Sequence, residues 1–206
     1  MATDLLNFNC EPNLTSNIKV IGVGGGGGNA VNYMFQKGIT DVGFILCNTD
    51  AQALNNSPVP ITIKLGESLT MGRGAGNMPE LGEQAAIENI DAVKAVLEDN
   101  TNMVFITACM GGGTGTGAAP VIAKACRELN ILTIAVVTVP SKSEGRKRYD
   151  QAIRGVENIR EHVDSLLVIN NEKIREIYGN LPASQAFAKA DEILSTAVKG
   201  VAEIIT

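Results

Sequence analysis

The seven residues Gly111–Gly117, with the sequence GGGTGTG, are the part of the chain best suited to chemistry. Five of them have no side chain, and Thr114 and Thr116 add only a hydroxyl. The run follows an apolar stretch, Met103–Cys109, and precedes one with helical spacing, Ala118–Leu129. Glycines in quantity cost backbone entropy, but they let several N–H groups approach an anion at a helix N-terminus. A flexible linker is the alternative, yet a linker does not sit between an apolar strand and an apolar helix. The run therefore favours phosphate binding.

A second glycine run, residues 22–29, follows the first apolar stretch of the chain. It matches the pattern G-x-G-x-x-G at Gly22, Gly24 and Gly27, which is a weak indication of a dinucleotide site when it stands alone. Asp50 follows the next apolar stretch and could hold the ribose of a nicotinamide dinucleotide. An NAD-dependent oxidoreductase that uses Gly22–Gly27 is therefore an alternative function.

A third glycine-bearing segment, Gly72–Gly76, favours a longer ligand. A pyrophosphate needs one glycine loop, whereas three loops after three strands suit a polyphosphate. The chain contains no Gly-Lys-Ser or Gly-Lys-Thr, so it lacks the lysine of a P-loop. The charge of a triphosphate would then be balanced by backbone amides, helix dipoles, a magnesium ion and a distant arginine.

Apolar and helical patterns alternate along the chain, which predicts an α/β fold: a Rossmann-like, doubly wound, mostly parallel sheet with helices on both faces, ending in a long helix. Runs that are continuously apolar indicate strands buried on both faces. The predicted strands are Ile18–Gly22, Gly43–Asn48, Ile61–Leu65, Met103–Ala108, Leu132–Val139 and Leu166–Ile169. The predicted helices are Asn29–Lys37, Leu81–Leu97, Thr116–Leu129, Arg146–His162 and Ala183–Thr206. Two segments stay unassigned, Asn55–Pro60 and Gly66–Pro79, and both are expected on the ligand side of the sheet because they follow strands.

Composition excludes several classes of function. With 206 residues the chain suits one domain with a full core, and its formal net charge of −5 argues against nucleic-acid binding. No apolar run approaches the roughly 18 residues that span a bilayer, so direct membrane insertion is not expected. The four cysteines form no CxxC pair and indicate buried thiols in a reducing cytoplasm. The single histidine, His162, cannot build a metal site, and no protein metal site is predicted.

Three of these runs together resemble a known family. Lys19–Val31, Asn48–Leu54 and Gly111–Gly117 are similar to the tubulin/FtsZ family of GTPases, and to its bacterial cell-division branch more than to tubulin. The resemblance extends from about Ile18 to Thr206. It implies a tubulin-like domain over residues 18–206 that binds GTP or GDP, with Mg²⁺ accompanying GTP. Residues 1–17 are expected to be a flexible tail.

The resemblance also implies which residues bind the nucleotide. Residues 24–29 would contact the phosphates and the guanosine, and residues 48–50 would lie near the phosphates. Residues 72–77 would sense the γ-phosphate, and residues 111–116 would hold the α- and β-phosphates. Glu144 would accept from the ribose hydroxyls and Arg148 would reach the γ-phosphate, whereas an ordinary solvated helix start is the alternative for both. The implied binding residues are Gly24, Gly25, Gly26, Gly28, Asn29, Asn48, Asp50, Gly74, Ala75, Gly76, Asn77, Gly111, Gly112, Gly113, Thr114, Gly115, Thr116, Glu144, Arg148, Asn171, Phe187 and Asp191.

The base would be read by Asn171 with Phe187 and Asp191. The last two are four residues apart on the final predicted helix and so share a face. Phe187 can stack on a purine, and the Asp191 carboxylate can accept both the N1–H and the exocyclic amine of guanine. A core role is the alternative for Phe187 alone.

The sequence departs from the family pattern at three places. Residues 74–80 read GAGNMPE where GAGANPE is commoner, which moves the asparagine. Tyr33 occupies a position that carries arginine in some relatives, and Asn170 replaces a proline. The family pattern therefore defines the nucleotide contacts of these segments less closely than it defines those of Gly111–Gly117.

In the family, GTP hydrolysis uses an acidic loop of one subunit against the nucleotide of the next. The chain contains no such loop after its last predicted helix, so no catalytic residue is assigned in it. It is expected to bind nucleotide but to hydrolyse GTP very slowly alone. The resemblance further implies self-association of the full-length protein into protofilaments of the cytokinetic ring, division partners that bind its C-terminal region, and a cytoplasmic location at mid-cell. A scaffold that has lost nucleotide is a third possible function.

One expectation concerns the final helix. With no second domain to cover it, Ile193, Leu194, Val198 and Val201 are expected to form an exposed apolar face.

Overall fold

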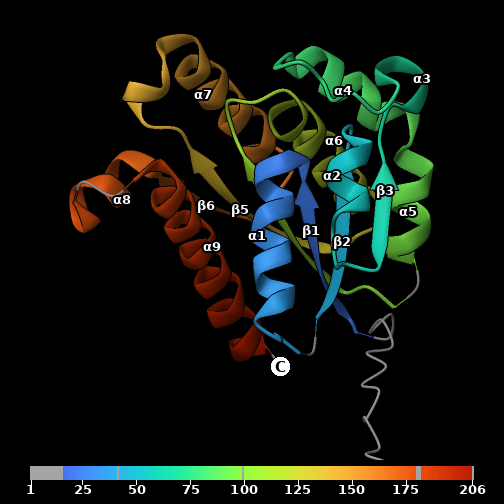
Figure 1. Ribbon diagram of the computed structural model, residues 1–206. Helices are drawn as coiled ribbons and strands as arrows, with labels where there is room; N and C mark the ends of the chain where they lie inside the picture. The colour runs from blue at the N-terminus through green and yellow to red at the C-terminus, as the bar shows by residue number, and fades with distance from the viewer. Residues whose placement is uncertain (1–15, 41, 99, 180–181, 206) are drawn as a thin grey trace, which may run out of the picture.

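Six parallel strands form one sheet at the centre of the molecule (Figure 1). The computed structural model describes residues 16–40, 42–98, 100–179 and 182–205, so most of the tail predicted over 1–17 lies outside the described residues. The strands, in sheet order, are β3 (Ile61–Lys64), β2 (Gly43–Asn48), β1 (Ile18–Val23), β4 (Met103–Cys109), β5 (Leu132–Val139) and β6 (Ser165–Asn170). The predicted α/β fold is confirmed, and the predicted strands match to within a residue or two.

Helices cover both faces of the sheet and divide the core into two parts. One hydrophobic cluster lies between the sheet and helices that include Ala85, Ile122 and Ile159, and the other includes Met34 and Leu194. The helices are α1 (Gly24–Gln36), α2 (Ala51–Asn55), α3 (Glu67–Thr70), α4 (Pro79–Glu88), α5 (Ile90–Glu98), α6 (Thr114–Glu128), α7 (Arg146–Arg160), α8 (Asn171–Tyr178) and α9 (Ala183–Ile205), with a 3-10 turn over Lys142–Glu144. Helices α4 to α7 thus pack on one face, and α1 and α9 on the other.

The first helix begins five residues before its predicted start at Asn29, because the glycine run is itself helical. The reason is close packing of α1 on the sheet. A Cβ added at Gly27 would lie 2.3 Å from the carbonyl oxygen of Thr107 in β4, and one at Gly26 would lie 2.2 Å from the Cys109 sulfur. Glycine has low helix propensity, but here it is the residue that lets the helix approach the strand.

The helix predicted over Leu81–Leu97 is two helices, α4 and α5, that meet at Asn89. The Asn89 side chain accepts a hydrogen bond from the amide of Gly66 at 2.7 Å, which ties the break to the loop after β3. The prediction that Asn55–Pro60 lies on the ligand side was also wrong. This segment leads from α2 into the start of β3, where Ser57 donates to the Asn32 side chain and Val59 is buried.

Two of the four residues predicted to form an exposed apolar face on the last helix are buried, and Ile193 is partly buried. Leu194 and Val198 are 0% and 1% exposed because they pack in the cluster with α1 and the sheet. The side chain of Val201 lies outside the described residues. Among the helices that the structure describes, none combines the length and the apolar character needed to cross a bilayer.

Gly117 provides a test of the contact between α6 and α4. A Cβ at this position would lie 1.9 Å from the Pro79 carbonyl oxygen and 2.6 Å from the Glu83 nitrogen. We expect Gly117→Ala to lower the free energy of unfolding in urea by about 1–3 kcal/mol, because neither backbone group can move alone. Gly200→Ala is the control: no described heavy atom lies within 4 Å of its Cβ position, so stability should hold or rise. Equal stabilities would contradict the close contact.

Candidate nucleotide site

A cavity of about 410 Å³ opens at the carboxyl edge of the sheet, between the starts of α1, α6 and α7 and one side of α9. This size lies in the range of pockets for small ligands. The structure brings twelve of the predicted binding residues together here. They are Gly25, Gly26, Asn29, Gly112, Gly113, Thr114, Gly115, Glu144, Arg148, Asn171, Phe187 and Asp191.

Two helix N-termini meet at this cavity. Helix α1 follows Val23 and helix α6 follows Gly113, and in neither case does a described side chain accept from the first amides. The two starts are in backbone contact, since a Cβ at Gly24 would lie 2.8 Å from the Gly115 nitrogen. The first amides of a helix have no carbonyl partner within it, and the helix dipole adds positive potential at the same place. The cavity is therefore arranged to bind an anion such as phosphate.

The glycines around the cavity are of two kinds. A Cβ at Gly26 or Gly115 would meet the Cys109 side chain or carbonyl within 2.7 Å, so packing of the protein itself requires these glycines. At Gly25 and Gly112 no described heavy atom lies within 4 Å of the Cβ position, although both residues line the cavity. Packing does not require glycine at these two positions, whereas close approach of a ligand to the backbone would.

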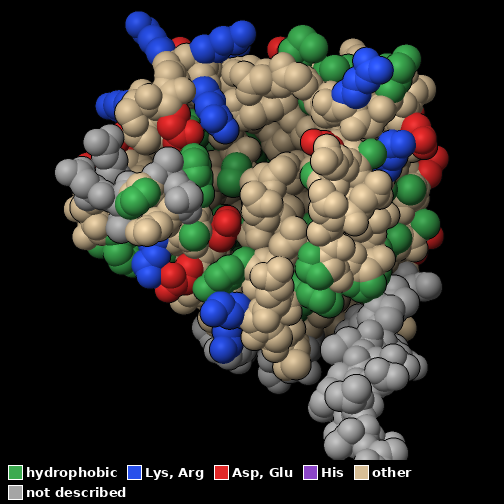
Figure 2. Space-filling model, in the orientation of Figure 1, with side chains coloured by type: hydrophobic (Ala, Val, Ile, Leu, Met, Phe, Trp, Pro, Cys, Tyr) green, Lys and Arg blue, Asp and Glu red, His purple; other side chains and the backbone are tan. Residues whose placement is uncertain are grey.

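Glu144 and Arg148 form the polar wall at the start of α7. The Glu144 carboxylate accepts from the Ser141 amide at 2.9 Å in a capping box and lies 3.5 Å from the Arg148 guanidinium. The Arg148 side chain is about half exposed and lines the cavity. Lys and Arg side chains gather on the surface at the edge where α7 begins (Figure 2, upper left). Positive side chains thus gather at this edge of a chain whose net charge is negative.

The opposite end of the cavity offers hydrogen-bond acceptors. The Oδ1 atom of Asn171 is buried and has no hydrogen-bond partner among the described residues. Burial raises the pKa of Asp191 to about 6, since a carboxylate loses hydration there. Phe187 lines the same cavity, and the residue is 52% exposed. An unpaired acceptor, a carboxylate and an open aromatic ring are the groups that a nucleobase with N–H donors would satisfy.

Several predicted residues lie outside this cavity. Gly24, Gly28 and Asn48 line a small hollow beside it. The Asp50 carboxylate accepts from the amides of Gln52 and Ala53 and caps α2, so the residue on which the NAD interpretation depended has a local role. Gly111 does not line the cavity, and neither does the segment Gly74–Asn77. This segment packs against the glycine run from another side, since a Cβ at Gly113 would lie 2.9 Å from the Ala75 Cβ. Their contacts with nucleotide stay predictions.

The two threonines of the glycine run differ in role. Thr114 lines the cavity, and its hydroxyl lies 2.7 Å from that of Thr49. The Thr116 hydroxyl points to the other side of the loop, where it accepts from the Gly111 amide at 2.8 Å. The Thr116 hydroxyl thus links the start of the glycine run at Gly111 to the first turn of α6.

The cavity also contains residues that the sequence did not indicate: Val23, Cys109, Met110, Thr138, Pro140 and Ala190. Most of them lie at or just after the carboxyl ends of β1, β4 and β5, and this position was the signal that could have found them. Burial raises the pKa of the Cys109 thiol to about 11. Cys47 and Cys126 are buried free thiols, as the sequence predicted, whereas the free Cys109 is only partly buried; Cys10 lies outside the described residues.

Comparison with known proteins places these features in a family. Residues 17–179 match the family described as "Tubulin/FtsZ family, GTPase domain". The chain is 54% identical to the cell division protein FtsZ of Porphyromonas gingivalis over 207 aligned residues, which cover 100% of the chain and 45% of that protein. It is 51% identical to FtsZ of Aquifex aeolicus, with 91% of the chain and 51% of the relative covered. The chain thus spans about half the length of these relatives.

Solved structures show the same likeness. An empty FtsZ dimer from M. jannaschii superposes with a TM-score of 0.89 at 45% identity, covering 93% of the chain and 55% of that structure. A protofilament of CetZ2 from Haloferax volcanii with bound GTPγS superposes with a TM-score of 0.81 at 25% identity, covering 90% and 57%. The predicted resemblance is confirmed.

The Thr116 hydrogen bond gives a prediction for the loop. Thr116→Val removes the acceptor of the buried Gly111 amide, so we expect unfolding to become easier by about 1–3 kcal/mol and hydrogen exchange at that amide to speed up. Thr116→Ser keeps the hydroxyl and should exchange at the wild-type rate. Slow exchange at Gly111 in the valine variant would show that the hydroxyl does not hold the loop.

Proposed function

Because the chain belongs to the tubulin/FtsZ family, we propose that it binds GTP or GDP across the carboxyl edge of its sheet. The observation that carries the proposal is the meeting of two helix N-termini without side-chain caps at one cavity. The phosphates would accept from the amides of Gly112–Gly115 and of the start of α1. Arg148 would turn to the outermost phosphate, where its planar guanidinium matches the oxygens.

The base would lie at the other end of the cavity. Phe187 would stack on the purine, and Asp191 would accept from N1–H and the exocyclic amine, which guanine presents together and adenine does not. Asn171 supports this arrangement because its buried Oδ1 needs a donor. Glu144 would accept from the ribose hydroxyls through the oxygen that faces Arg148, since its other oxygen accepts from Ser141.

Magnesium would accompany GTP through oxygens of the phosphates and through water. The described part of the chain has no group of three or more His, Cys, Asp or Glu side chains that could hold a metal ion. An ion that is bound chiefly by the nucleotide and by water would need no such group. Its charge would neutralise the phosphate oxygens beside Arg148.

Hydrolysis and assembly belong to the same proposal at the level of the longer protein. The CetZ2 relative was solved as a GTPγS-bound protofilament. We infer that this chain supplies the nucleotide-binding surface and that its protein self-associates into filaments during cell division, in the cytoplasm at mid-cell. The acidic groups that act on GTP would come from a part of the longer relatives that this chain does not span. The 206-residue chain would then turn over GTP very slowly alone.

An NAD-dependent oxidoreductase has no support from the family match or the relatives. Gly22 lines the small hollow beside the cavity and does not line the cavity itself. The proposed ligand is therefore a guanine nucleotide.

A calorimetric titration of the chain with GDP, and separately with NADH, tests the proposal. We expect tight GDP binding, no NADH binding, and at least about a tenfold loss of GDP affinity in Gly112→Ala, because the added methyl would take the place of a phosphate oxygen at the amides. The fold tolerates this methyl, since no described atom lies within 4 Å of it. Gly200→Ala is the matched control and should bind GDP as the unaltered chain does. NADH binding without GDP binding would refute the proposal. An unchanged GDP affinity of Gly112→Ala would show that the phosphates do not bind at the Gly112 amide.

Acidification should weaken GDP binding through Asp191. Its pKa in the free pocket is about 6, and only the carboxylate accepts both guanine donors. The affinity for GDP should therefore be constant above pH 7, and below pH 6 it should decrease by up to about tenfold per pH unit. Asp191→Asn should bind weakly with no such step, and inosine diphosphate, which lacks the exocyclic amine, should bind more weakly than GDP. A flat pH profile of the unaltered chain would exclude Asp191 as the base reader.

A further inference from the structure

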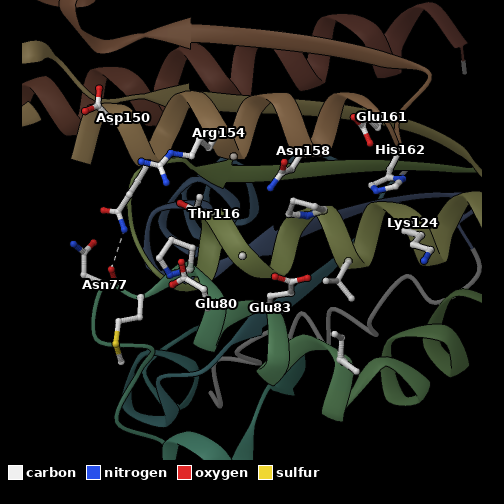
Figure 3. A pocket seen from close by; sticks show the side chains of 18 of the residues that line it. Asn77, Glu80, Glu83, Thr116, Lys124, Asp150, Arg154, Asn158, Glu161 and His162 are labelled. Carbon is white, nitrogen blue, oxygen red and sulfur yellow. Dashed lines mark hydrogen bonds between the residues drawn. The ribbon is translucent and has the colours of Figure 1, made fainter. Parts of the chain in front are cut away.

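One hydrogen bond joins helix α7 to the loop that leads into α4. It lies at the end of a groove of about 890 Å³ between α4 and α7, whose floor is α6 (Figure 3). There the Gln151 side chain of α7 donates from Nε2 to the Asn77 carbonyl oxygen at 3.3 Å (Figure 3, dashed line). Among the described residues, no other hydrogen bond joins the segment Gly74–Asn77 to α7. The nucleotide proposal makes no use of this bond.

The segment Gly74–Asn77 has a backbone conformation that its neighbours must hold. Three of its four residues have positive φ angles, among them Asn77 at 61°. Asparagine is one of the few residues besides glycine that adopt this left-handed conformation readily. The Gly74 amide donates to the Thr49 carbonyl oxygen at 3.1 Å, which fixes the start of the segment. The bond from Gln151 fixes its end.

The same segment lies directly against the glycine run. A Cβ at Gly113 would lie 2.9 Å from the Ala75 Cβ and 2.9 Å from the Met78 amide nitrogen. Ala75 is buried, and Gly113 lines the nucleotide cavity just before α6 begins. Because this contact leaves no room for a methyl group, a shift of the segment changes the space that is available to the Gly113 backbone.

Helix α7 also touches the glycine run, at its other end. A Cβ at Gly111 would lie 2.7 Å from the Arg148 carbonyl oxygen. Arg148 lines the nucleotide cavity and comes three residues before Gln151, so the two side chains leave neighbouring positions of α7. The contacts thus form a ring: the glycine run meets the segment at Gly113, Gln151 joins the segment to α7, and α7 returns to the run at Gly111. Gln151 closes this ring through its side chain, so one substitution can open it.

The other end of the Gln151 amide does not favour stability. Its Oε1 atom is buried and has no hydrogen-bond partner among the described residues. A buried acceptor without a partner destabilises a fold. Methionine has a similar length and helix propensity and would avoid this penalty. Stability therefore does not explain an amide at this position, whereas the N–H group that donates to Asn77 does.

We propose that Gln151 is a positioning residue for the γ-phosphate of GTP. It holds the segment Gly74–Asn77, which is expected to sense that phosphate, while Arg148 reaches the same phosphate from one turn earlier on α7. Gln151 acts through the segment and does not itself touch the nucleotide. This inference rests on the proposed nucleotide site. Because GDP has no γ-phosphate, the effect of Gln151 is specific to the triphosphate.

The variant Gln151→Met tests the proposal because it separates stability from nucleotide discrimination. It removes the donor and the unpaired oxygen together, so the free energy of unfolding in urea should hold or rise. We expect the dissociation constant of GTPγS to rise at least about threefold and that of GDP to change by less than about twofold. Asn158→Met is the matched control: it makes the same change at an exposed residue that lines the groove about two turns further along α7 (Figure 3), and it should leave both constants unchanged.

Amide hydrogen exchange of the nucleotide-free chain measures the hold on the segment directly. The Met78 amide, next to Asn77, donates to the Ala75 carbonyl oxygen at 2.9 Å. It should exchange faster in Gln151→Met than in the unaltered chain or in Asn158→Met, because the segment opens more often without its bond to α7. This measurement does not depend on nucleotide binding.

The outcomes distinguish this inference from the proposed function. An unaltered chain that binds neither GDP nor GTPγS refutes the proposed function, and this inference with it. If the unaltered chain binds both nucleotides, an unchanged ratio of their dissociation constants in Gln151→Met overturns the role of Gln151 alone. So does an unchanged exchange rate at Met78. A less stable Gln151→Met that loses affinity for both nucleotides equally would show a structural role and would overturn the inference as well.

Discussion

The structure depends on one constraint: two helices begin side by side at the carboxyl edge of the sheet, and at neither start does a described side chain cap the first amides. Strands β1 and β4 are neighbours in register, with Val23 opposite Ala108, so the helices that follow them must start at the same level. Their starts touch through Gly24 and Gly115. This contact concentrates positive potential on a cavity that an anion can fill, and the glycines, the Arg148 side chain and the Asp191 end are arranged around it.

Glycine has two separate uses around this constraint. Gly26, Gly27, Gly115 and Gly117 permit α1, α6, the sheet and α4 to pack at distances that a methyl group would prevent. Gly25 and Gly112 line the cavity and have free space around their Cβ positions, so their lack of a side chain would serve the proposed ligand. In this account the motif GGGTGTG combines the proposed anion site with close packing, and Thr116 binds the Gly111 amide within the same segment.

The sequence predicted the strands well because buried parallel strands are continuous apolar runs, as in Leu132–Val139. It predicted the fold and twelve residues of the cavity, the latter largely through family resemblance. It missed the helical start at Gly24, since the tertiary contact with Thr107 overrides the poor helix propensity of glycine. It missed the break at Asn89, which depends on a partner 23 residues away, and the burial of Leu194 and Val198, which depends on α1. Each error concerns a contact between segments that local patterns do not contain.

A crystal structure of the chain with GDP is the most direct test of the central claim. The account predicts the β-phosphate within hydrogen-bond distance of the amides at the starts of α6 and α1, the purine against Phe187, and Asp191 bound to N1–H and the exocyclic amine. GDP in the groove between α4 and α7, or in the cavity with its phosphates away from both helix starts, would contradict it.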